Sequence, residues 1–283
     1  DSKGTDAVKV SAVLREQEED SDFGEAMGMA FEYEVDSETF AIELFTADGS
    51  VRAALPLQER AVEDYRKKGE EVSWRYQEDG IAVSVSPEDD YLSVMITSET
   101  DRDNAFTWPE ISAYSYYFPF GEGKRVPADN SVWKDYLAGQ IGQPASSFPA
   151  DFAGQLEESN TTAQVSQPNP AGQPNPPAKE FSVLEQFSMP FWISSAGDYA
   201  VLFIMEDPFH TKIGFRQNPD LTFSLNNEFP AIDTDRTKQF RIYLTDNDPV
   251  SAAKLYRKYV RETDWFITLE QKAESNPMIR KLY

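Results

Sequence analysis

The sequence contains no cysteine and a single histidine, His210, and these two scarcities remove several kinds of chemistry. Without thiols the chain can form no disulfide, and it can neither bind metals through thiolates nor use a cysteine nucleophile. Zinc held by cysteine and histidine is excluded for the same reason. A serine–histidine–aspartate relay would run through His210, yet no Gly-x-Ser-x-Gly elbow accompanies it. We therefore expect a structural or solvated His210, in a turn, and assign the chain no cofactor and no metal.

Positive charge is also scarce, because 26 lysines and arginines face 49 aspartates and glutamates, giving a formal net charge of -23. Such a surface repels phosphate backbones and anionic lipid headgroups, so nucleic acid and membrane surfaces are poor partners. No apolar run approaches the roughly 20 residues needed to cross a bilayer. Acidic chains without cysteine are common among exported proteins of Gram-positive bacteria, and on that association we expect an extracellular or cell-surface protein.

One acidic run, Arg15–Asp22, stands near the start of the chain. We expect it to be an exposed lead-in, since a charge run is usually a solvated segment. A calcium loop is the alternative, but the Asp-x-Asp-x-Asp-Gly spacing of such loops is missing.

Hydrophobic residues make up 40% of the chain and aromatic residues 13%, enough to fill a large core. They recur with a period of two, as in Phe31, Tyr33 and Val35, which is typical of strands with one buried face. Strands are predicted over 31–35, 40–44, 51–57, 72–76, 81–85, 91–96, 181–187, 199–204, 212–215, 221–225 and 240–244. The turns between them are short, and 72–96 reads as a three-strand meander, so the sheets should be antiparallel. The polar stretch 59–71 is predicted to hold a helical turn or two. The fold class expected is a mainly β, large antiparallel β-sandwich.

Residues 153–180 contain proline, asparagine and glutamine and almost nothing apolar. Such a segment cannot offset the entropy of ordering by core burial, so we interpret it as a long insertion. Strand patterns return after it, and neither half looks self-sufficient. One β-sandwich domain over 1–247 is therefore preferred to two domains.

The pattern changes after residue 247. Asp248 is placed to cap a helix with Pro249 at its first position, and five residues then recur at helical spacing. They are Ala252, Leu255, Tyr256, Tyr259 and Val260. A second helix is predicted from Trp265 to Ala273, and the apolar end Met278–Tyr283 lacks anything that would cover it. We interpret 248–283 as a helical connector whose faces lean on a partner beyond the sequence given.

Three motifs carry a resemblance to a known family. Tyr117–Asn130, Ser188–Trp192, and Ala253–Tyr259 with the later Asn276-Pro277 resemble the N-terminal region of glycoside hydrolase family 129. That family is related to the family 101 endo-α-N-acetylgalactosaminidases. The resemblance implies a galactose-mutarotase-like supersandwich followed by a (β/α)₈ barrel that hydrolyses α-linked N-acetylgalactosamine. The two catalytic carboxylates of such a retaining enzyme would lie in the barrel, so no catalytic residue is assigned here.

Two sets of residues are candidates for contact with a substrate. The first is the loop Phe120, Gly121, Glu122, Gly123, Lys124 and Arg125, in which two glycines flank a carboxylate and two cations follow. It is either an ordinary turn with solvated charges or a loop that projects toward the substrate face of a barrel. The second is an aromatic platform of Trp108, Tyr116 and Trp133, because flat rings stack on sugars. The alternative is that these rings belong to the core.

Three functions follow, from different classes. The leading hypothesis is a non-catalytic domain of a secreted glycoside hydrolase that packs against and supports the barrel. The alternative is an autonomous carbohydrate-binding module. A self-contained mutarotase-like enzyme is disfavoured, since its acid–base pair usually includes a histidine. Exposure of the faces formed by Leu255 and Tyr259 and by Ile279 and Leu282 would favour the docking role, because an uncovered apolar patch marks an absent partner.

Overall fold

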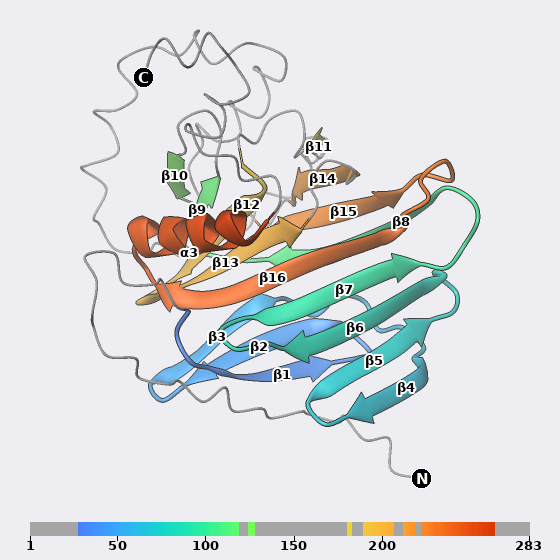
Figure 1. Cartoon of the computed structure of the whole chain (residues 1–283), viewed down its shortest axis with the longest axis horizontal. Coiled ribbons are helices and arrows are strands. Elements are labelled where there is room, and N and C mark those ends of the chain that lie inside the picture. The colour runs from blue at the N-terminus through green and yellow to red at the C-terminus, as the bar shows by residue number, and fades with distance from the viewer. Residues whose placement is uncertain are drawn as a thin grey trace, which may run out of the picture.

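The computed structural model describes residues 28–118, 124–127, 180–182, 189–206, 212–218 and 222–263. These residues form three antiparallel sheets and one helix (Figure 1). The largest sheet has nine strands in the order β10-β9-β12-β13-β16-β7-β6-β5-β4. Its strands are β4 (Glu63–Lys68), β5 (Glu71–Tyr76), β6 (Ile81–Pro87), β7 (Leu92–Ser98), β9 (Ser115–Phe118), β10 (Lys124–Pro127), β12 (Phe191–Ala196), β13 (Tyr199–Glu206) and β16 (Thr237–Asp246).

The other two sheets face the large one. One has the order β1-β2-β3 and the other β11-β14-β15-β8. Their strands are β1 (Glu32–Asp36), β2 (Ala41–Thr46), β3 (Gly49–Ala54), β8 (Asn104–Ile111), β11 (Glu180–Ser182), β14 (Lys212–Gln217) and β15 (Phe223–Phe229). The Leu55 amide beyond β3 donates to the Glu110 carbonyl of β8 at 2.8 Å, which joins the two smaller sheets into one layer. The expected large antiparallel β-sandwich is confirmed.

The core between the layers is built from the inward positions of the alternating strands. Val72, Trp74 and Tyr76 of β5 point inward, whereas the residues between them do not. The ring of Phe40 stacks on Trp108 with centroids 4.3 Å apart and meets Trp74 edge to face at 5.2 Å. Such aromatic pairs add to the stabilisation that area burial provides.

The polar stretch 59–71 contains the strand β4 and no helical turn, so the prediction of a helical turn there is wrong. β4 is an edge strand with five of its six residues exposed. It pairs with β5, and a bulge between Glu63 and Arg66 shifts the register of this pairing. A polar sequence is stable at a sheet edge because one side of it faces water. The predicted meander of β5, β6 and β7 is confirmed.

The helix α3 (Pro249–Glu262) lies on the outer face of the nine-stranded sheet (Figure 1). Asp248 caps it as predicted, since its carboxylate accepts from the Val250 amide at 3.0 Å. No helix among the described residues is long and apolar enough to span a membrane. Trp265–Ala273 and Met278–Tyr283 lie outside the described residues, as do the acidic run Arg15–Asp22 and most of the 153–180 insertion.

Candidate functional site

The glycine loop is described only at its end. Phe120, Gly121, Glu122 and Gly123 lie outside the described residues. Lys124 and Arg125 begin β10, the edge strand that pairs with β9 in the register Lys124↔Phe118 and Arg125↔Tyr117. The position of this loop relative to a substrate stays a prediction.

The prediction of an aromatic platform is wrong for Trp108 and Tyr116, the two of its residues that the structure describes. Trp108 and Tyr116 are 0% and 1% exposed, so neither ring can stack on a sugar at the surface. Trp108 donates from its ring nitrogen to the Phe40 carbonyl at 2.9 Å, and the Tyr116 hydroxyl donates to the Ile111 carbonyl at 3.1 Å. These rings belong to the core, which was the alternative interpretation. Trp133, like His210, lies outside the described residues.

The junction between α3 and the nine-stranded sheet is the first of two features that stand out. Ala252, Leu255 and Tyr259 are buried against an apolar patch on the outer face of the sheet. That patch consists of Phe191, Ile193, Ala200, Leu202, Ile204 and Tyr243. Leu255 and Tyr259 were expected to face an absent partner, and this expectation is wrong because the chain covers them itself. The periodicity of the helix had indicated a buried face without identifying what buries it.

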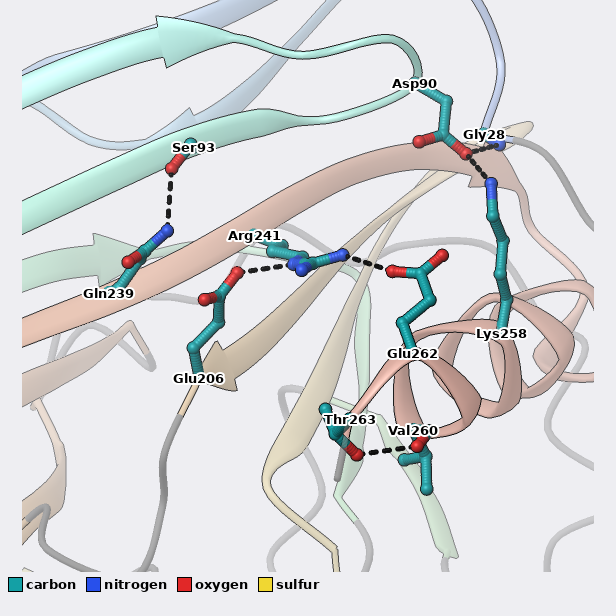
Figure 2. A network of polar contacts seen from close by, with 10 residues as sticks. All are labelled: Gly28, Asp90, Ser93, Glu206, Gln239, Arg241, Lys258, Val260, Glu262 and Thr263. Carbon is teal, nitrogen blue, oxygen red and sulfur yellow. Dashed lines mark hydrogen bonds and ion pairs between the residues drawn. The ribbon is translucent and has the colours of Figure 1, made fainter. Parts of the chain in front are cut away.

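Arg241 of β16 is the polar centre of this junction (Figure 2). Its guanidinium donates to the carboxylates of Glu206 and Glu262, at 2.5 and 3.0 Å. The same guanidinium lies 4.6 Å from the ring centroid of Tyr91 and 4.7 Å from that of Tyr259. Burial lowers the pKa of Arg241, but the hydrogen bonds to Glu206 and Tyr243 outweigh it, so the pKa is raised and the side chain stays charged.

A second polar contact ties the helix to the start of the described chain (Figure 2). Asp90, in the turn between β6 and β7, is 6% exposed and accepts from Lys258 of α3 at 3.0 Å. The same carboxylate accepts from the Gly28 amide at 3.4 Å. A Cβ at Gly28 would come within 2.5 Å of the Asp90 carbonyl oxygen, so this approach needs glycine.

The second feature is a hollow of about 290 Å³ on the same outer face, over β4 to β7. Its floor lies where Ser73 of β5 pairs with Ser84 of β6, beside Ala82. Longer side chains stand around these small ones, among them Arg66 and Met95. A concavity forms because the small side chains of Ser73, Ala82 and Ser84 occupy three neighbouring outward positions.

An ion-pair triad borders the hollow. Arg75 donates to both oxygens of Glu99, at 2.8 and 3.1 Å from Nε, and to Asp64 at 3.1 Å. Asp64 sits beside the β4 bulge with φ 50°, the left-handed region that non-glycine residues seldom adopt. Hydrogen bonds to Glu99 and then to Asp64 raise the pKa of Arg75. Because arginine does not give up its proton, this arrangement offers binding rather than proton transfer.

The sequence did not single out either feature. Arg241 was part of a predicted strand, and its charge at an outward position beside Tyr243 was the available signal. The sequence signal for the hollow was weaker, because serine and alanine at the outward positions of β5 and β6 are equally consistent with a flat, solvent-exposed face. Its shape depends on the cross-strand register, which pattern reasoning does not supply. Among the described residues no group of three or more histidine, cysteine, aspartate or glutamate side chains could hold a metal ion.

Solved structures similar to this chain include several of the α-N-acetylgalactosaminidase NagBb of Bifidobacterium bifidum. Its ligand-free form matches with a TM-score of 0.56 and 14% identity over 89% of this chain. The quadruple mutant and the GalNAc complex match with TM-scores of 0.54 and 0.52 at the same identity. The chain has a glycoside hydrolase-related fold. It spans about 40% of the length of the enzyme it matches. No family model and no curated protein sequence matches.

Proposed function

We propose that this chain is a non-catalytic β-sandwich domain of a secreted bacterial glycoside hydrolase, and that it packs against and supports a (β/α)₈ barrel. The observation that carries the proposal is the shared fold, over 89% of this chain, with part of an α-N-acetylgalactosaminidase. The resemblance of Tyr117–Asn130 and Ser188–Trp192 to family 129 points the same way. The substrate proposed for the whole protein is an α-linked N-acetylgalactosamine or a related glycan.

The outward face of α3 supplies a surface suited to this role. Its inner face is already buried on the sheet, so a barrel can touch only the other side. Lys254, Arg257 and Arg261 are exposed there and follow one another at helical spacing. A basic stripe on a chain of net charge -23 is complementary to an acidic surface. We assign the stripe to the contact with the barrel.

The experiment compares this chain with the longer protein that we propose contains it. Both are assayed for hydrolysis of p-nitrophenyl α-N-acetylgalactosaminide. We expect the longer protein to release p-nitrophenol and the isolated chain to release none. Hydrolysis by the isolated chain, or a gene that encodes no barrel, would overturn the proposal.

Charge reversal tests the contact itself. Lys254→Glu should lower the thermal midpoint of the longer protein by about 2–4 °C, because it opposes the acidic surface that we propose. It should leave the midpoint of the isolated chain unchanged, since Lys254 is exposed there. Lys67→Glu, on the exposed edge strand β4, is the matched control and should affect neither protein. Equal shifts in both proteins would show that Lys254 has no role at an interface.

A further inference from the structure

The hollow over β4 to β7 has a regular origin in the sheet. Two outward rows cross the strands side by side. One row runs from Arg66 through Ser73 and Ser84 to Met95, and the other runs from Arg75 through Ala82 to Thr97. In the first row the two serines stand between the large side chains of Arg66 and Met95, and in the second row the alanine stands between Arg75 and the shorter Thr97. The hollow is therefore built into the register of the sheet and does not depend on a loop.

The charges around the hollow nearly balance. Asp64, Arg66 and Arg75 line it, and Glu99 holds Arg75 from the side. The carboxylate of Glu71 accepts from the serine of β6 on the floor at 3.5 Å. Three carboxylates and two guanidinium groups leave one negative charge in excess, and the chain as a whole carries a net charge of -23, so anions are disfavoured. A neutral polar ligand suits these surroundings better than an anionic one.

The polar groups at the rim are joined to one another before any ligand arrives. Four hydrogen bonds link the guanidinium of Arg75 to the carboxylates of Glu99 and Asp64. Carboxylate oxygens and guanidinium N–H groups fixed side by side can accept from and donate to neighbouring hydroxyls. Met95, 37% exposed, adds an apolar surface at the end of the serine row. Vicinal hydroxyls beside a nonpolar C–H face are the features of a pyranose that match this combination.

We propose that this hollow binds one neutral sugar residue. Its volume of about 290 Å³ falls just below the roughly 300–1,000 Å³ typical of pockets for drug-sized ligands, so it suits a single ring. The site is separate from the aromatic platform that the sequence suggested, and from the junction of α3. It goes beyond the supporting role proposed above, since sugar binding here requires no barrel.

The test is titration of the isotopically labelled chain with single sugars, followed by amide chemical shifts. The probes are methyl α-N-acetylgalactosaminide, methyl α-galactoside and methyl α-galacturonide. We expect saturable shifts at Ser73, Ser84 and Thr97 with at least one neutral probe, with a Kd on the order of 1 mM because the hollow is open. The galacturonide has the ring of the galactoside with an added charge, and we expect it to bind several-fold more weakly than the galactoside.

Two variants remove the site in different ways. Ser84→Trp fills the hollow and should weaken binding about tenfold or more, whereas Ser50→Trp places the same side chain on the exposed end of β3 and should not. Arg75→Gln keeps the shape but removes the charged donor, and should weaken binding about threefold to tenfold. Thermal unfolding of each variant shows whether it is folded.

Several results would overturn the sugar site. They are the absence of saturable shifts with every probe, tighter binding of the galacturonide than of the galactoside, shifts confined to another part of the chain, and unchanged binding in folded Ser84→Trp. None of these results bears on hydrolysis by the longer protein, so the supporting role and the sugar site can fail separately.

Discussion

The outer face of the nine-stranded sheet has two halves that differ in what covers them. Over β12, β13 and β16 the outward positions are Ile193, Leu202, Ile204 and Tyr243, and α3 lies across them. Over β5, β6 and β7 they are Ser73, Ser84, Ala82 and Thr97, and the hollow lies there instead. The inward positions of both halves are mostly apolar and share one core, with Ser98, Ser194 and Lys238 as buried polar exceptions.

The difference is visible within single strands. Residues 200–205 of β13 are buried on both faces, whereas in β6 the buried residues Ile81, Val83 and Val85 alternate with half-buried ones. A strand that is apolar on both faces needs a layer on each side, while an alternating strand needs only one. The covered half thus stabilises the fold and holds α3, and the open half is free to bind something else.

The two halves should differ most in the free energy of unfolding that is lost when one apolar side chain in each is truncated. Leu202→Ala removes a fully buried side chain beneath α3 and should reduce the free energy of unfolding by about 2–5 kcal/mol. Met95→Ala, on the open half, should reduce it by less than about 1 kcal/mol. Urea unfolding of both variants measures the difference. Equal losses would mean that the open half is also closely packed.

Replacing an arginine in each half should produce a smaller difference in the free energy of unfolding. Arg241→Met leaves the carboxylates of Glu206 and Glu262 without their guanidinium, and Glu206 is only 23% exposed. We expect a loss of about 2 kcal/mol in the free energy of unfolding, because a partly buried charge then has no partner. The same change at the exposed Arg75 should leave the urea midpoint unchanged.

A double-mutant cycle checks the cause. In the Glu206→Gln background the loss caused by Arg241→Met should shrink by about 1 kcal/mol, since the orphaned carboxylate is gone. An undiminished loss would assign the effect to the contacts of Arg241 with the rings of Tyr91 and Tyr259 instead.

Most of the sandwich was predictable because period-two alternation records burial residue by residue. It located β1, β2, β5, β6, β7, β13 and β16, and helical spacing with the Asp248 cap located α3. Strands β8 and β12 were not predicted. Trp108 of β8 was interpreted as a possible sugar-binding ring, and the start of β12 was considered only as part of a motif that resembles family 129. β4 was missed because an edge strand can consist mostly of charged, exposed residues, and its sequence then lacks apolar alternation.

The candidate sites could not be predicted to the same degree. Trp108 looks identical in sequence whether it stacks on a sugar or on Phe40, and only the packing of the layers decides. The hollow needs Ser73, Ser84 and Ala82 to be neighbours across two strands, which is a property of register. The helix face was correctly read as buried, but its partner is the sheet rather than a domain beyond the sequence given.

The smallest expected effect is a dependence of stability on pH that arises from Tyr256 in the covered half. Tyr256 of α3 packs on Phe191 with ring centroids 4.6 Å apart, and burial raises the pKa of its hydroxyl from 10.0 to about 12. The folded state therefore holds this proton more tightly than the unfolded state does. The resulting stability is fully present below pH 10 and is lost as the pH rises toward about 12.

Replacing Tyr256 with phenylalanine removes the proton and keeps the ring. The free energy of unfolding should then fall less steeply above pH 10 than it does in the unaltered chain. Part of the fall should remain, because burial also raises the pKa of Tyr33, Tyr76 and Tyr243. Urea unfolding at intervals between neutral pH and pH 12 measures the slope, with Tyr114→Phe, at a ring 73% exposed, as the matched control. Parallel curves for Tyr256→Phe and the unaltered chain would show that α3 has already left the sheet at alkaline pH, and that the covered half opens before the core does.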